Sequence, residues 1–294
     1  MRHSIAIMLA AAMLSACAHS PFGKPDAEPV PAAPLTAPND GLNATLWMQG
    51  AVEYKANAEA VYALARLRLD EALKDPAWSA VPQMEPANFK KLPPAVILDV
   101  DETVLDNSAY QARLVSDDTE FSGPQWSAFV ESRSSVPVPG ALAFTQYAAS
   151  KGVAVYYVTN RNSSGEAATF DNLKAFGFPV SKTPDTLLTQ GEKKEWASRK
   201  ESRFASVAAK HRVLLLIGDN FGDFTDAAYG DPAERMAAYE ANADHWGRDW
   251  LALPNPSYGS WESSLYGRNY SLPAGERRTM KREALKPWTG ETPE

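Results

Sequence analysis

A buried strand that runs directly into a cluster of acids is the feature that most constrains this fold. Residues 94–107 read PAVILDVDETVLDN, in which an apolar run leads to Asp99, Asp101 and Glu102. A short, continuous apolar run indicates a strand covered on both faces, as in a parallel sheet. Two carboxylates this close at a strand's end repel each other and lose hydration, so a cation or a proton must offset them. The stretch therefore predicts a metal-assisted site.

An isolated pair of acids after a strand is more often an ordinary solvated strand end. Features in the rest of the chain are therefore needed to distinguish a metal site from this alternative. The chain has a net charge of −7 and no long basic run, which argues against a groove for polymeric nucleic acid. An anionic substrate therefore needs local positive charge at the site. Four histidines and one cysteine are too few for a zinc cage, whereas a hard cation held by oxygen ligands fits this composition.

The first residues have the pattern of a secretion signal. MRHSIAIMLAAAMLSAC combines a basic start, an apolar run too short to span a bilayer, and small residues after it. LSAC, which ends at Cys17, resembles the bacterial lipobox, in which the cysteine becomes the lipidated first residue of the mature protein. A plain signal peptide with an incidental cysteine is the alternative. Because Ala18 and not an aspartate follows, the resemblance implies the outer membrane, with a lipid anchor as the only membrane attachment.

The chain is expected to divide into three parts. Residues 1–16 form the signal peptide, residues 17–42 hold the lipidated cysteine and a tether rich in Pro and Ala, and residues 43–294 form one large domain. Within this domain, apolar residues recur every three or four positions across residues 43–73. This spacing predicts an amphipathic helix whose apolar stripe is a packing surface.

Two further apolar runs also end in polar motifs. VAVYYV precedes Thr159, Asn160 and Arg161, and VLLLI precedes GDNFGDF, which contains Asp219 and Asp223. Helical patterns separate the three runs and give the βαβ alternation of a parallel sheet. Open α/β sheets bind ligands at the carboxyl ends of their strands, so Thr159 and the backbone N–H groups beside it are candidate phosphate ligands.

Three other stretches supply candidate substrate-binding groups. Residues 107–138 are long for a simple connection and are expected to cover the acids as a cap, with Trp126 as their conspicuous side chain. Residues 191–212 predict a helix rich in Lys and Arg, and a lysine is needed where a phosphate dianion approaches carboxylates. LPNPSYGSWE predicts a rigid loop that presents Tyr258. For Trp126 and Tyr258 alike, packing inside the protein is an equal alternative.

Taken in order, DVDETVLDN, VTNR and GDNFGDF resemble the motifs of the haloacid-dehalogenase-like phosphohydrolases of the four-aspartate branch. With the NPSYG loop, the chain resembles the class C acid phosphatases, the outer-membrane lipoprotein phosphatase and 5′-nucleotidase family, from about residue 43 to beyond Trp261. The resemblance implies a doubly wound parallel, Rossmann-like α/β sheet with DVDET on the central strand, and an α-helical cap.

The lysine of the family has more than one candidate in this chain. Family members carry a Lys, typically followed by Ser, three residues before an Arg. Lys200 and Arg203 have this spacing, but Glu201 stands where Ser is usual. Lys193 and Lys194 are the alternatives.

The resemblance also implies an activity, the Mg²⁺-dependent hydrolysis of phosphomonoesters, with nucleoside monophosphates as substrates. Asp99 is then the nucleophile that becomes an aspartyl phosphate, and Asp101 is the general acid and base. The resemblance further implies that Asp99, Asp219 and the backbone carbonyl of Asp101 bind Mg²⁺, and that Asp223 orders the metal shell or the lysine. It implies phosphate binding by Thr159, Asn160 and Lys200. It also implies that Trp126 and Tyr258 stack on the substrate base.

Two other functions fit the same residues. A surface lipoprotein that has lost catalysis would retain nucleotides without releasing phosphate. A phosphotransferase of the same fold would pass the phosphoryl group to another alcohol instead of water.

Overall fold

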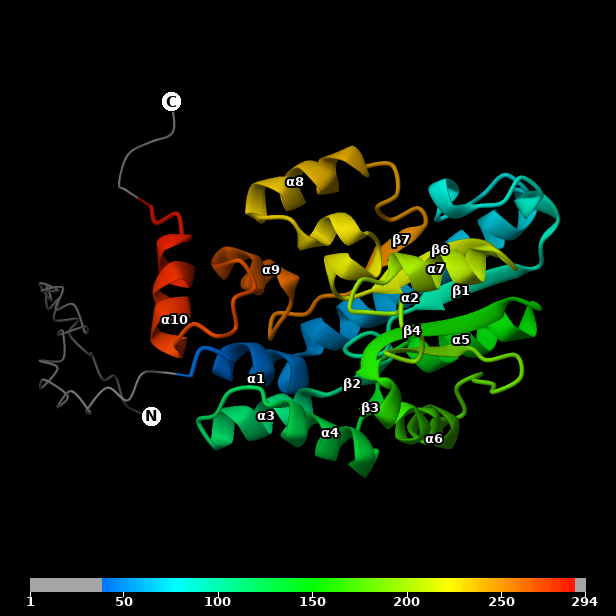
Figure 1. Cartoon of the computed structure of the whole chain (residues 1–294). Helices are drawn as coiled ribbons and strands as arrows, with labels where there is room; N and C mark the ends of the chain where they lie inside the picture. Colours follow the sequence, from blue (N-terminus) through cyan, green and yellow to red (C-terminus); the bar gives the residue numbers. More distant parts are fainter. Residues whose placement is uncertain (1–38, 289–294) are drawn as a thin grey trace, which may run out of the picture. The chain divides into compact units, whose positions relative to one another are not determined.

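Five parallel strands form the central sheet of the residues that the computed structural model describes, 39–288 (Figure 1). Their spatial order is β5 (Leu187–Gln190), β4 (Ala154–Asn162), β1 (Pro94–Leu98), β6 (Arg212–Gly218) and β7 (Trp250–Ala252). The strand that leads into the DVDET motif is therefore the central one, and the predicted parallel sheet is confirmed.

The inner strands are covered on both faces. Val96 and Leu98 of β1 lie in the hydrophobic core on one face, and Ala95 and Ile97 lie in the core on the other. Strand β6 is buried at every position. Side chains alternate between the two faces of a strand, so a strand with two buried faces needs an apolar residue at each position. This is why the apolar runs in the sequence are continuous and do not alternate.

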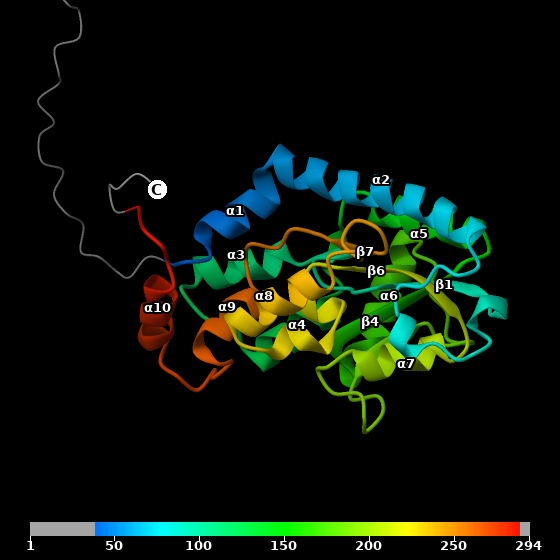
Figure 2. The same cartoon turned by 90° about the horizontal axis from the view of Figure 1, so that it is seen from above.

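Helices supply the two covering layers. On one face, α2 (Val52–Lys74) packs against α5 (Ala141–Ser150), and α6 (Glu166–Phe176) adds Leu173 to the same core. On the other face, α7 (Glu201–Ala208) contributes Phe204 and Val207. Figure 2 shows α2 running along one side of the molecule beside α5.

Gly140, immediately before α5, permits its close approach to α2. Its φ is +85°, and a Cβ at this position would lie 2.9 Å from the Cβ of Tyr62. Only glycine adopts such a conformation readily and leaves this space free.

The cap is helical and lies beyond the carboxyl ends of the strands, at the left of Figure 1. Its helices are α3 (Ser108–Ser116) and α4 (Gly123–Ser132), enclosed by the antiparallel pair β2 (Leu105–Asp106) and β3 (Val136–Pro137). Helix α1 (Leu42–Gly50) contacts α3, and α4 contacts α6. The remaining helical elements are α8 (Pro232–Ala241), α9 (Ser260–Ser263), α10 (Ala274–Glu283) and the 3₁₀ turns η1 (Pro82–Met84), η2 (Phe89–Lys91), η3 (Ser163–Gly165), η4 (Phe221–Asp223), η5 (Asp226–Tyr229) and η6 (Ser264–Tyr266).

Two predicted helices differ from the observed ones. The helix predicted for residues 43–73 is interrupted at Ala51, whose ψ of 132° is extended, directly after the weak helix former Gly50. The basic helix predicted for residues 191–212 begins only at Glu201. Before it, the chain folds into a loop that buries Trp196 against the sheet, so tertiary packing overrides the helical pattern there.

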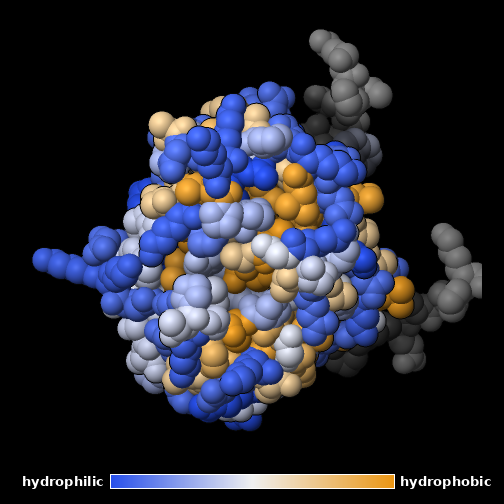
Figure 3. All heavy atoms as spheres, turned by 90° about the vertical axis from the view of Figure 1, so that its right-hand side faces the viewer, coloured by the Kyte–Doolittle hydropathy of each residue, from blue (hydrophilic) through white to orange (hydrophobic). Residues whose placement is uncertain are grey.

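The opposite end of the sheet, where the strands begin, faces the viewer in Figure 3 and shows apolar patches between hydrophilic side chains. A cavity of about 390 Å³ near Val153 and Pro179 is lined by no ionisable residue. Across residues 39–288, none of the helices has the length and apolar character that a bilayer span requires.

Candidate active site

Two aspartates follow directly on the ends of the two central strands. Asp99 comes after β1 and Asp219 after β6, and the pairing of Leu98 with Ile217 makes these strands end side by side. Asp223, in η4, completes a group in which ligand oxygens of all three acids lie within 4.8 Å of one another. The sheet therefore assembles the acid cluster that the sequence predicts.

The acid cluster holds more negative charge than its protein neighbours offset. Burial raises the pKa of Asp99 to about 7, and burial next to Asp223 and Asp99 raises the pKa of Asp219 well above its usual value. Asn255 donates to Asp219 at 2.8 Å and Thr103 donates to it at 3.1 Å, but both donors are neutral. When all three carboxylates are ionised, Lys200 compensates one of their charges and leaves two uncompensated, which adds to the effect of burial in raising the pKa values of Asp99 and Asp219. This donor set fits a divalent cation that prefers oxygen ligands.

Lys200 is the lysine of the acid cluster. Its Nζ donates to the carboxylate of Asp99 and, at 2.7 Å, to Oδ1 of Asp223. Burial lowers the pKa of Lys200, but the two carboxylates raise it by more, so the ammonium group stays protonated. Lys193 and Lys194 are exposed. The structure thus brings Lys200, and neither of the two alternatives, to the acids.

Arg203 and Glu201 hold the segment around Lys200 in place. The buried guanidinium of Arg203 donates to the backbone carbonyl of Thr159 at 2.5 Å and to Oδ1 of Asn160 at 2.6 Å. Glu201 accepts a hydrogen bond from the backbone N–H of Asp226 at 2.7 Å. The residue that replaces the usual Ser therefore ties α7 to the loop after the GDNFGDF motif.

The two predicted phosphate ligands at the end of β4 lie in different surroundings. Thr159 is buried, and its hydroxyl lies 3.4 Å from Oδ2 of Asp101. Asn160 is exposed, and its amide Nδ2 donates to the carbonyl of Ser198 at 3.0 Å while its Oδ1 accepts from Arg203. Thr159 therefore lies beside Asp101, whereas the side chain of Asn160 supports the Lys200 segment. Phosphate binding by either residue stays a prediction.

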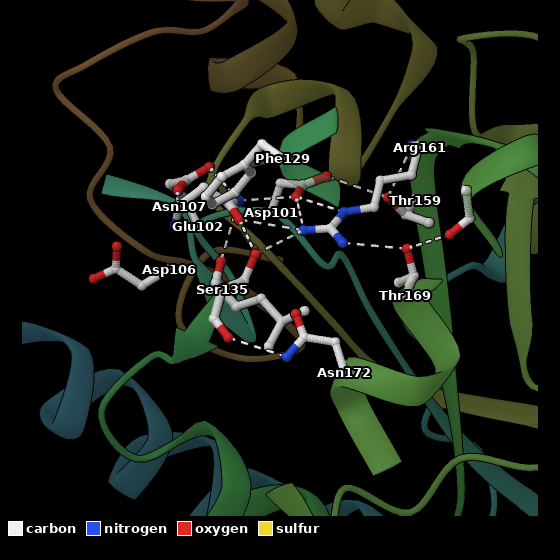
Figure 4. A network of polar contacts seen from close by, with 12 residues as sticks. Asp101, Glu102, Asp106, Asn107, Phe129, Ser135, Thr159, Arg161, Thr169 and Asn172 are labelled. Atoms are coloured by element: carbon white, nitrogen blue, oxygen red, sulfur yellow. Dashed lines mark hydrogen bonds and ion pairs between the residues drawn. The ribbon is translucent and has the colours of Figure 1, made fainter. Parts of the chain in front are cut away.

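Asp101 is held by one of its two carboxylate oxygens (Figure 4). Oδ1 accepts hydrogen bonds from Asn107 at 2.8 Å and from Nε of Arg161 at 2.9 Å. Among the described residues, Oδ2 has only the long contact with Thr159. This arrangement fixes the side chain and leaves Oδ2 able to meet a ligand.

Glu102 connects the first motif to the NPSYG loop. It is fully buried, and its φ of +60° is a conformation that residues with a side chain rarely adopt. Its Oε1 accepts from the backbone N–H of Asn107 at 2.7 Å, and its Oε2 accepts from the hydroxyl of Tyr258. Burial raises the pKa of Glu102 to about 8. Tyr258 is therefore fixed through its hydroxyl to the residue that follows Asp101.

Trp126 lies among the aromatic side chains of the cap. Its ring centroid is 5.1 Å from that of Tyr110 and 5.6 Å from that of Phe129. The guanidinium of Arg161 lies 5.5 Å from the Trp126 centroid. Trp126 therefore lies next to Arg161, which contacts Asp101 of the first motif, and Tyr258 contacts Glu102 of the same motif. A base clamp formed by Trp126 and Tyr258 stays a prediction.

Four residues with no role predicted from the sequence lie around Asp101 and Asp219: Glu102, Asn107, Arg161 and Asn255. Glu102, Asn107 and Arg161 stand inside or next to the motifs DVDETVLDN and VTNR, and Asn255 stands in NPSYG. Position within a motif is the one signal that could have drawn attention to them, because their partners come from distant parts of the chain.

A parallel sheet with a helical cap, and an aspartate cluster with a lysine at the carboxyl ends of its strands, define the haloacid-dehalogenase-like class of phosphohydrolases. The family model of the HAD superfamily, subfamily IIIB (acid phosphatase), matches residues 22–261. The chain belongs to this family and is a phosphatase, which confirms the resemblance seen in the sequence.

Two solved structures agree with this family. The class C acid phosphatase from Bacillus anthracis is 33% identical over 84% of this chain and 97% of its own, with a TM-score of 0.74. A crystal structure of the class C acid phosphatase from the same organism with tungstate bound is 32% identical, with the same coverage and TM-score.

Proposed function

We propose that this chain is a Mg²⁺-dependent phosphomonoesterase of the cell envelope that acts on nucleoside monophosphates through an aspartyl phosphate at Asp99. The observation that carries the proposal is the contact of buried Lys200 with both Asp99 and Asp223. A lysine between carboxylates compensates part of their charge and offers a donor to an incoming phosphate. A divalent cation bound at the acid cluster and the ammonium group of Lys200 would together supply the positive charge that a phosphate dianion requires.

Each residue of the site has a role in the proposed reaction. Asp99 attacks phosphorus as the bond to the leaving oxygen breaks, and Asp101 gives that oxygen a proton. Water then attacks phosphorus, Asp101 takes a proton from this water, and the bond between phosphorus and the Asp99 oxygen breaks to release phosphate. Mg²⁺, held by Asp99, Asp219 and the backbone carbonyl of Asp101, would supply Lewis-acid charge to phosphate oxygens. Lys200 and the hydroxyl of Thr159 bind the remaining oxygens, and Asp223 holds Lys200.

The test of this function is phosphate release from a panel of monoesters, measured with chelator and with Mg²⁺ added back. We expect release that stops with chelator and returns with Mg²⁺. Retention of nucleotide without release would favour the non-catalytic lipoprotein. Transfer to an added alcohol at the expense of free phosphate would favour the phosphotransferase.

Substrate preference is expected to depend on Trp126 and Tyr258. If the two rings receive a base, Trp126→Ala and Tyr258→Ala each remove a stacking contact of about 1 to 3 kcal/mol and raise KM for nucleotides by about one to two powers of ten. KM for a small ester without a ring should barely change. Tyr258→Phe is the matched control, because it keeps the ring and loses only the hydroxyl bond to Glu102. Equal KM changes for both substrates would show that these rings only pack.

We also propose that Cys17 is lipidated and anchors the mature protein at the outer membrane. Cys17, the signal peptide and residues 17–38 of the tether lie outside the described residues, so the proposal rests on the sequence pattern. Fractionation of the wild type and Cys17→Ser tests it: wild-type protein found entirely in the periplasm would end this proposal without touching the catalytic one.

A further inference from the structure

We propose that Arg161 is a positioning residue for Asp101: its guanidinium holds the carboxylate so that Oδ2 faces the leaving oxygen of the substrate. The inference rests on the proposed function, in which Asp101 exchanges protons with that oxygen. Arg161 belongs to the VTNR motif, but its partners lie in the first motif, the cap and α6 (Figure 4).

All three nitrogens of the Arg161 guanidinium are engaged, and its side chain is only 1% exposed. Nε and Nη2 approach Oδ1 of Asp101 at 2.9 Å and 2.8 Å, which is a two-pronged contact with a single oxygen. Nη1 donates to the hydroxyl of Thr169 on α6 at 3.2 Å. Because Asp101 holds Nε and Nη2 and α6 holds Nη1, the guanidinium has one orientation, and it imposes one orientation on Asp101.

Asn107 fixes the same oxygen from a second direction. Nη2 of Arg161 lies 3.2 Å from Oδ1 of Asn107, and because arginine has no acceptor this amide atom must be the oxygen. The amide nitrogen then faces Asp101 and donates to its Oδ1 at 2.8 Å. Ser135 completes the arrangement by donating to Oδ1 of Asn107 at 2.5 Å. The orientation of the asparagine thus depends on Arg161 and on a cap residue.

The consequence is an asymmetric carboxylate. Oδ1 of Asp101 is held by Asn107 and Arg161, while within residues 39–288 Oδ2 has one contact, at 3.4 Å. The guanidinium lies over the Trp126 ring, so the cap encloses Arg161 on this side. Arg161 therefore links the position of the cap to the position of the proton donor.

The test compares two esters that differ in their need for a proton. A nucleoside monophosphate loses an alkoxide, which needs the proton of Asp101, whereas p-nitrophenyl phosphate loses a stable phenolate. Formation of the phosphoenzyme is measured in single-turnover experiments, since the later attack by water is common to both substrates. We expect Arg161→Gln to slow this step about 10- to 100-fold for the nucleotide, as a displaced catalytic group does, and much less for the phenyl ester.

Two further variants separate positioning from folding. Arg161→Lys keeps the charge but not the two-pronged contact, and should restore only part of the rate with the nucleotide. Arg212→Gln is the matched control: its guanidinium is also buried, but donates to the backbone carbonyls of Ala72 and Asp75 far from Asp101. It should lower stability and leave the ratio of the two rates unchanged.

The deciding measurement is Arg161→Gln in an Asp101→Asn background. Positioning through Asp101 predicts no additional loss of rate with the nucleotide. An additional loss of similar size for both esters would make Arg161 a structural residue and overturn the inference, while the Asp101 role would stand. If Asp101→Asn alone slowed both esters equally, the acid role in the proposed function would fail, and this inference with it.

Discussion

Asp99→Asn is expected to reduce phosphate release by about 10⁴-fold or more, because one substitution removes the nucleophile and a metal ligand. Asp101→Asn keeps the backbone carbonyl proposed to bind Mg²⁺ and loses only proton transfer, which is typically a loss of about 10² to 10⁴. Steady-state kinetics at saturating Mg²⁺ measure both. Substrate should still bind to Asp101→Asn, so its KM should change far less than its kcat.

Asp106→Asn is the matched control for these two variants. Asp106 stands in the same motif, but it accepts a hydrogen bond from the backbone N–H of Ser108 at 2.7 Å, and the acid cluster does not include it. The asparagine keeps an acceptor for that bond, so turnover should stay near the wild-type value. Near wild-type turnover by Asp99→Asn instead would exclude the covalent mechanism.

Lys200→Met is expected to lower both activity and the stability of the metal-free protein. It removes the cation from Asp99 and Asp223, and the loss of one partner of a buried ion pair typically costs about 3 to 5 kcal/mol. Because Lys200 and a divalent cation compensate the same carboxylates, the variant should bind Mg²⁺ more tightly than the wild type. Thermal unfolding with increasing Mg²⁺ should therefore show a larger rise in Tm for Lys200→Met.

Lys193→Met is the control for this prediction, because Lys193 is exposed and its ammonium lies 4.0 Å from the ring centroid of Trp196, away from the acids. It should behave like the wild type in both assays. A Lys200→Met protein with unchanged metal-free Tm and unchanged turnover would show that Lys200 neither compensates the acids nor binds phosphate.

The central part of the fold could be predicted because it is encoded locally. The apolar runs before Asp99, Thr159 and Asp219 are continuous since β1, β4 and β6 are buried on both faces, and parallel strands must gather their carboxyl ends at one edge. The acid cluster follows from these two facts. The break at Ala51 and the loop before Glu201 were missed, because packing of the finished fold decides them.

The polar surroundings of Asp101 could not be predicted in the same way. Arg161 contacts Asp101 and Asn107, which lie 60 and 54 positions away, and Tyr258 reaches Glu102 across 156 positions. No local sequence pattern indicates that an arginine is buried or predicts which residues it contacts. The choice of Lys200 over Lys193 and Lys194 was likewise open in the sequence, and the position of α7 decides it.

The measurement that tests the central claim most directly is the location of the phosphoryl group during turnover. Enzyme mixed with a nucleoside monophosphate and Mg²⁺ is quenched in acid within a single turnover, digested and examined by mass spectrometry. With p-nitrophenyl phosphate, whose leaving group needs no proton, Asp101→Asn should increase the trapped fraction, because release by water is slowed while transfer to Asp99 is not. We expect one phosphorylated peptide, with the phosphoryl group on Asp99. A phosphoryl group on another residue, or none in either protein while product forms at its normal rate, would contradict the mechanism.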